Sequence, residues 1–399
     1  MIVNRIEKHL IKKSNPMWKI IDRKCYDAKN LYNEANYIVR QEFINNGKWI
    51  RYNELDKIMQ EKDNYYILGS QASQNTLALL DKNWKSFFKS IKNWSKKKGD
   101  GYFGKPNLPK YKDKNGRSIL IIKNIQCRIT NNNLYFSWKP LNKFSGIKTK
   151  VNGKLMQIRF VPSGSCYFME IVYQIEIPEQ KCFNNRIAGI DIGVNNFATI
   201  ANNIGEMPII INGRVIKSMN QYYNKRKSEI LSKSNMHWNN KAQLLTDKHR
   251  NKIDTFTHKA SKMVIDWCLF NNIYTLIIGR NKGWKDGVNI GHINNQNFVY
   301  IPFDKFIRQL SYKCENAGIN FIITEEDYTS GTSFIDNELP IEENYNKKRR
   351  IKRGLFKSNN GIKINADLNS AYQIIKKVFP NAFGQWNRGC DLHPVRLNV

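Results

Sequence analysis

The second half of the chain alternates strand and helix signals in an order that restricts the folds it can adopt. After Arg186, three apolar runs of strand length read IAGIDIG, FATIAN and PIIING, separated by Asn, Gly and Pro. Helical periods cover 215–233, 241–270 and 302–317, further strands cover 274–279 and 319–326, and a last helix starts near Asp367. This order predicts a mixed sheet with helices packed against it.

That order is the one expected of an RNase H-like α/β fold, which we assign to residues 186–399. The first half of the chain reads differently, because short strands bounded by Asn, Gly and Pro predict a small antiparallel barrel or sandwich. Two helical regions, from residue 19 to 46 and from 68 to 96, interrupt the strands. We therefore expect a multidomain α+β protein with a β domain formed by 1–18 and 100–185, a helical insertion over 19–99, and the α/β domain.

The charge of the chain points to a polyanionic partner. There are 65 Lys and Arg residues against 33 Asp and Glu, a formal net charge of +32. Self-repulsion on this scale opposes compaction unless a polyanion neutralises it, and nucleic acid is the usual one. The sequence has no apolar run of about 18 residues and no signal-peptide pattern, so we expect a cytoplasmic protein with no membrane partner. A basic enzyme that binds no nucleic acid is the alternative.

Basic residues are interleaved with aromatic ones between Lys82 and Arg117, where twelve Lys or Arg residues accompany two acids. Cations suit phosphates and aromatic faces stack on unpaired bases. For the aromatic residues at helical spacing, however, a place in the core is the expected one. For any single lysine, a solvated surface position is the alternative. The side chains expected to contact nucleic acid are Lys85, Lys89, Lys92, Lys105, Lys110, Lys112, Arg250, Lys252, Lys259, Arg349 and Arg350.

Four acids stand where a metal-dependent hydrolase would need them. Phosphodiester hydrolysis requires charge stabilisation on the attacking and leaving oxygens, which two Mg²⁺ ions held by a few carboxylates supply. Asp191 is a lone acid in an apolar strand, where an unpaired charge is costly; capping a turn is its alternative. Asp367 stands at a helix start, with a plain N-cap as its alternative. Glu325 and Glu326 end a strand, and adjacent side chains of a strand point to opposite faces of the sheet, so only one of the two is expected to face the metal. The alternative is that both are simply solvated at the strand end.

At this point the sequence resembles a known family. The run GIDIGVNNFATIANN is similar to the first RuvC motif of the transposon-encoded TnpB (OrfB) family, which is related to the type V CRISPR effectors. Four further stretches resemble the family's other motifs in order: CYDAKNLYNEANYIVRQEF, SQASQNTLALLDKNWKSFFKSIKNW followed by GYFGKPNLPKYKDKNGRSIL, FDKFIRQLSYKCENAGINFIITEEDYTS, and INADLNSAYQI. The resemblance spans nearly the whole chain.

The resemblance implies RNA-guided, Mg²⁺-dependent cleavage of DNA in a single RuvC site, with two ions expected. Asp191 takes the place of the first catalytic Asp and Asp367 that of the last. The family's usual Glu follows the strand TLIIG, and the matching position here is Gly279. Some relatives place the acid later, as E-x-[Phe/Tyr]-T-S; Glu326 in EDYTS fits that position, with Glu325 as the fallback. We predict Asp191, Glu326 and Asp367 as the catalytic and metal-binding residues.

A second departure concerns the zinc ribbon that the family carries before its last motif. Ser333 stands where a Cys is expected and no Cys lies between Cys314 and Cys390, so we predict no zinc. A basic segment at 346–357, within an insertion over about 331–362, either replaces the ribbon as a nucleic-acid contact or forms a disordered loop. By resemblance, the β domain is a WED-like barrel and its helical insertion is REC-like.

The predicted function is therefore RNA-guided DNA cleavage, with a guide RNA and target double-stranded DNA as partners. A nuclease-inactive, repressor-like RNA-guided DNA-binding protein is the first alternative. Gly279 in place of the usual Glu favours this alternative, whereas the presence of Asp191, Glu326 and Asp367 argues against it. A nuclease that needs no guide is the second alternative.

Overall fold

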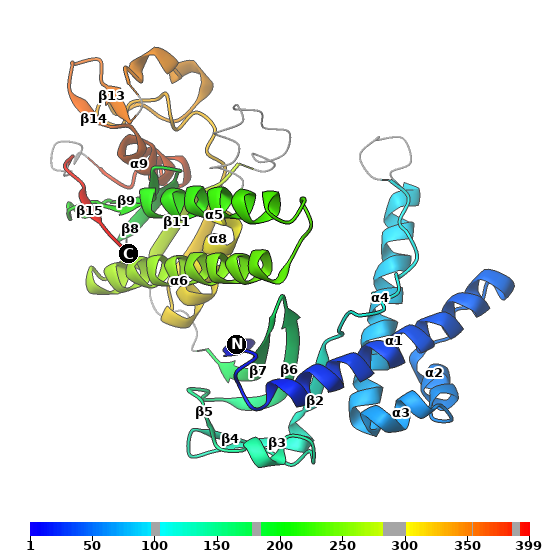
Figure 1. Ribbon diagram of the computed structural model, residues 1–399. Coiled ribbons are helices and arrows are strands. Elements are labelled where there is room, and N and C mark those ends of the chain that lie inside the picture. The colour runs from blue at the N-terminus through cyan, green and yellow to red at the C-terminus, as the bar shows by residue number, and fades with distance from the viewer. Residues whose placement is uncertain (97–103, 178–184, 282–300, 353, 385–391) are drawn as a thin grey trace. The chain divides into compact units, whose positions relative to one another are not determined.

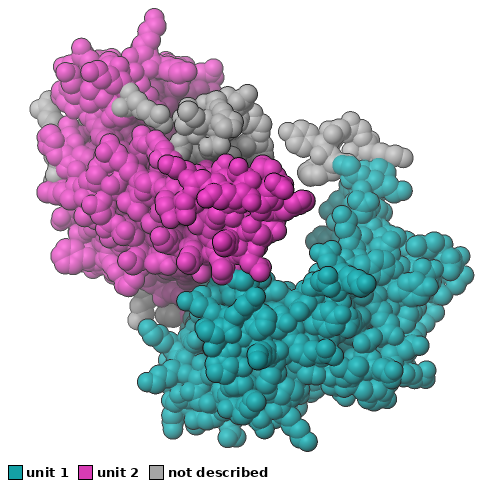
Figure 2. Space-filling view, viewed as in Figure 1, with its two compact units in different colours: residues 1–176 teal, residues 177–399 magenta. Residues whose placement is uncertain are grey.

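The computed structural model describes residues 1–96, 104–177, 185–281, 301–352, 354–384 and 392–399. It divides into two compact units, residues 1–176 and residues 177–399 (Figure 2). The boundary predicted between residues 185 and 186 follows residues 178–184, which lie outside the described ranges. In the described part of the chain, no helix is both long and apolar enough to cross a membrane.

The first unit is built on two antiparallel sheets. The larger sheet has the order β1-β7-β6-β2, and the smaller has the order β3-β4-β5. The first strand thus pairs with the seventh along its whole length, from Ile2 opposite Glu176 to Ile11 opposite Tyr167. The strands are β1 (Ile2–Ile11), β2 (Leu120–Lys123), β3 (Cys127–Thr130), β4 (Asn133–Phe136), β5 (Ile147–Lys148), β6 (Lys154–Ser163) and β7 (Cys166–Glu176), with short 3₁₀ turns at Asn124–Gln126 and Asn142–Phe144.

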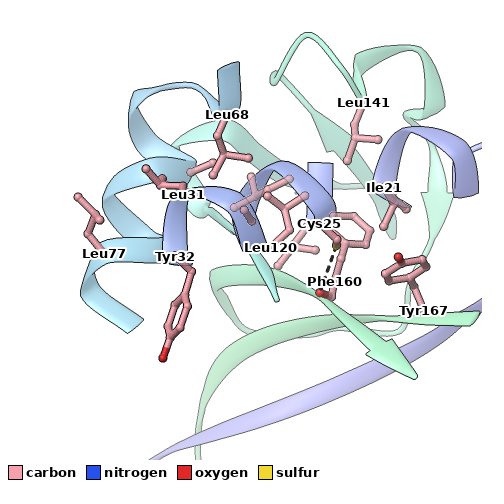
Figure 3. Close-up of a cluster of buried hydrophobic side chains, with 14 of the residues drawn as sticks. Ile21, Cys25, Leu31, Tyr32, Leu68, Leu77, Leu120, Leu141, Phe160 and Tyr167 are labelled. Carbon is pink, nitrogen blue, oxygen red and sulfur yellow. Dashed lines mark hydrogen bonds between the residues drawn. The ribbon is translucent and has the colours of Figure 1, made fainter. Parts of the chain in front are cut away.

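In the described residues, four helices follow β1 and precede β2, so they stand in the chain between the two edge strands of the larger sheet (Figure 1). They are α1 (Trp18–Asn46), α2 (Tyr52–Met59), α3 (Asp63–Leu68) and α4 (Ser70–Lys96). The helices and sheets share one hydrophobic core, in which Cys25 of α1 packs near Leu120 and Phe160 of the larger sheet (Figure 3). This shared core fixes the helices on the sheet through apolar burial.

The second unit contains one six-stranded sheet with the order β12-β11-β8-β9-β10-β15. β12, β11 and β8 are parallel, β8, β9 and β10 are antiparallel, and β15 adds to β10 in parallel. The mixed sheet predicted from the sequence is thus confirmed. The strands are β8 (Ile187–Ile192), β9 (Asn196–Asn202), β10 (Ile209–Asn212), β11 (Thr275–Gly279), β12 (Asn320–Thr324) and β15 (Val395–Leu397).

Helices cover both faces of this sheet. Residues of α5, α6 and α8 share one buried cluster with Ala188 and Ile190 of β8, whereas α9 packs with Ile187 and Ile277 in a separate cluster. The close approach of α9 requires Gly189, because a Cβ there would lie 2.5 Å from the carbonyl oxygen of Ala371. The helices are α5 (Arg214–Ser232), α6 (Asn240–Phe270), α8 (Phe303–Ala317) and α9 (Ala366–Val378).

An insertion separates β12 from α9. It contains 3₁₀ turns at Glu342–Asn344 and Lys347–Arg349 and a hairpin of β13 (Leu355–Lys357) with β14 (Lys363–Asn365). The hairpin leads directly into α9, since β14 ends one residue before the helix begins. The insertion therefore connects to the sheet at the end where the predicted acids stand.

Candidate active site

Asp191 lies on the face of the sheet that α9 covers. Side chains alternate along a strand, so Asp191 faces the same side as Gly189, against which α9 packs. In β9 the residue opposite Asp191 is Thr199, which is fully buried and whose hydroxyl has no hydrogen-bond partner within the described residues. The Asp191 carboxylate is itself only partly exposed. Asp191 and Thr199 thus lie together on the face of the sheet that α9 covers.

Asp367 lies in the first turn of α9, but it does not cap the helix. The N-cap is Asn365, whose side-chain oxygen accepts hydrogen bonds from the backbone N–H groups of Asp367 and Leu368 at 3.0 and 3.2 Å. The simple N-cap alternative for Asp367 is thus wrong. Its carboxylate is instead free to accept from Asn196 Nδ2 at 2.8 Å and from an Arg350 guanidinium nitrogen at 3.4 Å.

Glu326 reaches the same face from the end of β12. β11 and β12 are parallel neighbours, with Gly279 paired to Thr324, so their carboxyl ends lie side by side. A Cβ at Gly279 would stand 2.5 Å from Glu326 Cγ and 2.7 Å from Ile374 Cδ1 of α9. The space that a residue-279 side chain would need is thus occupied by Glu326. Glu325, the fallback, is exposed.

Two neighbouring acids act on Asp191. The pKa of Asp191 is raised well above its usual value, first by burial and then by the negative charges of Asp367 and Glu326, while Arg350 acts in the opposite direction. Burial raises the pKa of Glu326 to about 7, with Asp327 adding to the shift and Lys377 opposing it. Acids from β8, from the end of β12 and from α9 therefore share one region of like charge.

The donor chemistry of this region fits a divalent cation. Glu326 Oε1 is buried and accepts no hydrogen bond from the described residues, so a hard acceptor is left unsatisfied beside two further carboxylates. A cation would also relieve the repulsion that raises the pKa of Asp191. Among the described residues, however, no three His, Cys, Asp or Glu side chains stand close enough together to form a complete ligand group. The carboxylates thus approach one another without forming a preassembled cage.

The basic residues expected to contact nucleic acid lie mostly at the surface of their units. In the first unit all six are exposed, and of these Lys85 pairs with Asp81 at 2.5 Å. In the second unit Lys252 and Lys259 are exposed on α6, whereas Arg250 pairs with Asp247 at 3.0 Å. An ion pair on a solvated face leaves a cation able to exchange partners.

The two arginines of the insertion have different surroundings. Arg349 pairs with Glu338 and only 15% of its side chain is exposed, which leaves it poorly placed for a phosphate. Arg350 lies beside Asp367 and is 36% exposed. Among its described residues, the segment 346–357 contains the 3₁₀ turn Lys347–Arg349 and strand β13.

Sequence reasoning missed two asparagines. Asn196 orients Asp367 from 171 positions away in the chain, and nothing in the run GVNN distinguishes it from an ordinary turn residue. Asn365 had a readable signal, because an Asn just before a helix is a common N-cap. Asn365 stands two residues before Asp367, which identifies Asn365 as the N-cap and leaves Asp367 available for another role.

Comparisons with known proteins agree on the region that holds these residues. A family model described as "Probable transposase" (OrfB_IS605) matches residues 170–285, and one described as "Cas12f1-like, TNB domain" matches residues 303–374. The "TnpB-like protein ORF457" of Acidianus two-tailed virus is 22% identical over 396 residues, which cover 88% of this chain and 81% of that protein.

Solved structures show weaker similarity. A Cas12f1-sgRNA-target DNA complex matches with a TM-score of 0.39 and 16% identity over 93% of this chain and 98% of that one. The mini-RNA-guided endonuclease CRISPR-Cas_phi3 matches with a TM-score of 0.47 and 10% identity over 98% and 93%. This chain is thus similar to the OrfB_IS605 and Cas12f1-like families over the matched residues and to a viral TnpB-like protein over most of its length.

Proposed function

We propose that this protein is an RNA-guided DNA endonuclease that hydrolyses target DNA in one Mg²⁺-dependent site of the RuvC type. The observation that carries the proposal is the placement of three acids from distant stretches of the chain: Asp191 lies on the face of the sheet that α9 covers, Glu326 fills the space beside Gly279 and Ile374 of α9, and Asp367 stands in the first turn of that helix. The space left by Gly279 supports the same conclusion, because it accommodates the acid that arrives from the neighbouring strand.

In the proposed site, Asp191, Glu326 and Asp367 hold the metal. When bound, two Mg²⁺ ions stabilise negative charge on the attacking and leaving oxygens of the phosphodiester. The surrounding residues orient the carboxylates: Asn196 donates to one oxygen of Asp367, while Arg350 lies beside the other. Arg350 is partly exposed, which suits a guanidinium that also contacts a substrate phosphate.

We assign different roles to the two units. A WED-like β domain (1–18 and 100–185), most of which belongs to the first unit, binds guide RNA and the DNA next to the target together with its REC-like helices (19–99). In the second, residues 186–399 form an RNase H-like RuvC domain that cuts. The net charge of +32 and the exposed lysines of both units support binding to two nucleic acids.

A cleavage assay tests the proposal. The RNA that co-purifies with the full chain is sequenced, a plasmid carrying the matching target is prepared, and the loaded protein is incubated with it and Mg²⁺. We expect linear or nicked plasmid with the parent protein. Asp191→Ala, Glu326→Ala and Asp367→Ala should each lower the rate by about 10³-fold or more, since metal stabilisation of the transition state contributes several kcal/mol. Glu325→Ala is the matched control and should cleave normally.

One observation favours a second candidate, an RNA-guided DNA-binding protein that does not cleave. Within the described ranges the acids do not form a complete ligand group. The same assay separates the two functions when it is paired with a gel-shift measurement on the target. Guide-dependent binding with no cut product under Mg²⁺ or Mn²⁺ would establish the second candidate and refute the first.

A further inference from the structure

A pocket of about 380 Å³ lies in the first unit between the second half of α4 and the segment that follows it in the described chain, residues 104–112. The ring of Tyr32 and the ring of Phe87 line it, together with prolines of that segment. Tyr32 belongs to the hydrophobic cluster of the unit, and Figure 3 shows its hydroxyl pointing away from that cluster. The pocket thus has an apolar wall anchored in the core.

The pocket wall formed by residues 104–112 is held by side chains of α1. Asn36 Nδ2 and an Arg40 guanidinium nitrogen donate to the carbonyl oxygen of Pro109 at 3.0 and 2.9 Å. Asn33 forms two hydrogen bonds with the backbone of Lys112, at 2.9 Å to its oxygen and 2.8 Å from its nitrogen. Residues 33, 36 and 40 share one face of a helix. The segment is therefore held in place before any ligand arrives, which lowers the entropic cost of binding.

The lining combines the groups that recognise an unstacked nucleotide. Tyr111 lines the pocket and is 43% exposed, so its ring can stack on a base, and Lys110 and Lys112 supply charge for a phosphate. Asn83 donates to the hydroxyl of Tyr32 at 2.9 Å, which leaves the amide carbonyl of Asn83 as an acceptor for a base edge. The volume suits one small ligand rather than a run of bases.

We propose that this pocket binds a single unstacked nucleotide of the guide RNA. RNA is favoured over DNA because loops and bulges of folded RNA present splayed bases, whereas a base of duplex DNA must first be flipped out at a cost of a few kcal/mol. The inference rests on the proposed function for the identity of the RNA. The pocket is in the first unit, whereas the carboxylates are in the second, so its test requires no cleavage.

The test uses the full chain, stripped of nucleic acid, and a ten-nucleotide RNA of mixed sequence carrying 4-thiouridine at random positions. After irradiation, mass spectrometry identifies the crosslinked peptides. We expect a crosslink in residues 83–90 or 104–112. Ser90→Trp places a bulky ring in the pocket from an exposed helix position and should reduce that crosslink about tenfold or more, given the contribution of base stacking.

Ser95→Trp is the matched control, because Ser95 is exposed on the same helix but does not line the pocket. It should leave the crosslink unchanged, and circular dichroism checks that both variants are folded. Three results would overturn the proposal: no crosslink in either peptide, equal loss with both variants, or an equally strong crosslink to a DNA probe carrying 4-thiothymidine. A cleavage-inactive Asp191→Ala chain should crosslink as the parent does, so failure of the proposed nuclease activity and failure of the pocket are distinguishable.

Discussion

Gly279 and Glu326 form a complementary pair at one point of the sheet. A residue at position 279 with any side chain would contact Glu326 Cγ at 2.5 Å. The missing acid on β11 is therefore a condition for the acid after β12, because both would occupy the same volume.

Gly279→Ala tests this complementarity. The added methyl group must displace Glu326 or Ile374, so we expect a loss of stability of about 1–3 kcal/mol from overpacking. Plasmid cleavage should fall by about 10²-fold, because a catalytic group displaced by about 1 Å loses that much. Thermal melts and the cleavage assay measure the two effects. Gly104→Ala, where nothing lies within 4 Å of the added atom, should change neither.

The raised pKa of Glu326 predicts a pH-dependent stability of the metal-free chain. The folded-state pKa of about 7 lies above the usual value of 4.5 for a glutamate, so the folded state binds the proton more tightly and loses stability as pH rises through this window. Glu326→Gln mimics the protonated acid. Its stability relative to the parent chain should increase between pH 5 and pH 8, on the order of 1–3 kcal/mol.

Urea unfolding of both chains in EDTA at the two pH values measures this difference. Mg²⁺ should then stabilise the parent chain more than the glutamine variant, because the amide binds the ion more weakly than a carboxylate does. A pH-independent difference would contradict the pKa account.

At the scale of elements, α9 is the support on which the site depends. Its N-cap, Asn365, follows the hairpin of the insertion and fixes the first turn that carries Asp367. Because the cap and the acid are separate residues, the cap can be removed without removing the carboxylate.

Asn365→Ala should lower the free energy of unfolding by about 1 kcal/mol through loss of the cap. It should also slow cleavage, because the turn that carries Asp367 is less firmly held. Asn365→Ser retains a capping side chain and should preserve most of both properties. Equal behaviour of the two variants in urea unfolding would show that the cap does not stabilise this turn.

Sequence predicted the long elements well and the short ones poorly. The order of strands and helices around Asp191 could be predicted because apolar periodicity over many residues is a strong signal. Helices α2 and α3, with eight and six residues, and strand β15, with three, were not predicted. Elements this short depend on neighbours that are distant in sequence, such as β10 for β15.

The candidate site shows the same division. Motif spacing selected Asp191 and Asp367, and the rule of alternating side chains left Glu325 and Glu326 open. The hydrogen bond from Asn196 to Asp367 spans 171 positions, and no local pattern encodes such a pairing. The metal-binding role of the three acids stays a prediction that the geometry supports.

At the scale of the molecule, the charge of +32 is the dominant property. A chain of this charge repels itself when no polyanion is bound. Bound nucleic acid is therefore expected to stabilise the folded chain in addition to its proposed role in guiding cleavage.

Removal of co-purified RNA should lower the melting temperature of the chain at low ionic strength. Raising NaCl to about 1 M should recover part of the loss, because the Debye length falls to roughly 3 Å and screens the repulsion. Differential scanning fluorimetry across salt concentrations measures both changes. An RNA-free chain that melts at the same temperature at low and high salt would argue against self-repulsion.

The central claim is that Asp191, Glu326 and Asp367 bind a divalent cation together, and Mn²⁺ titration followed by electron paramagnetic resonance tests it most directly. The RNA-free full chain should bind Mn²⁺ at least about tenfold more tightly than Glu326→Ala or Asp191→Ala, since each loses a hard carboxylate ligand. The Glu325→Ala chain should match the parent. Equal Mn²⁺ affinity in the parent chain and in the Asp191 and Glu326 variants would contradict the account.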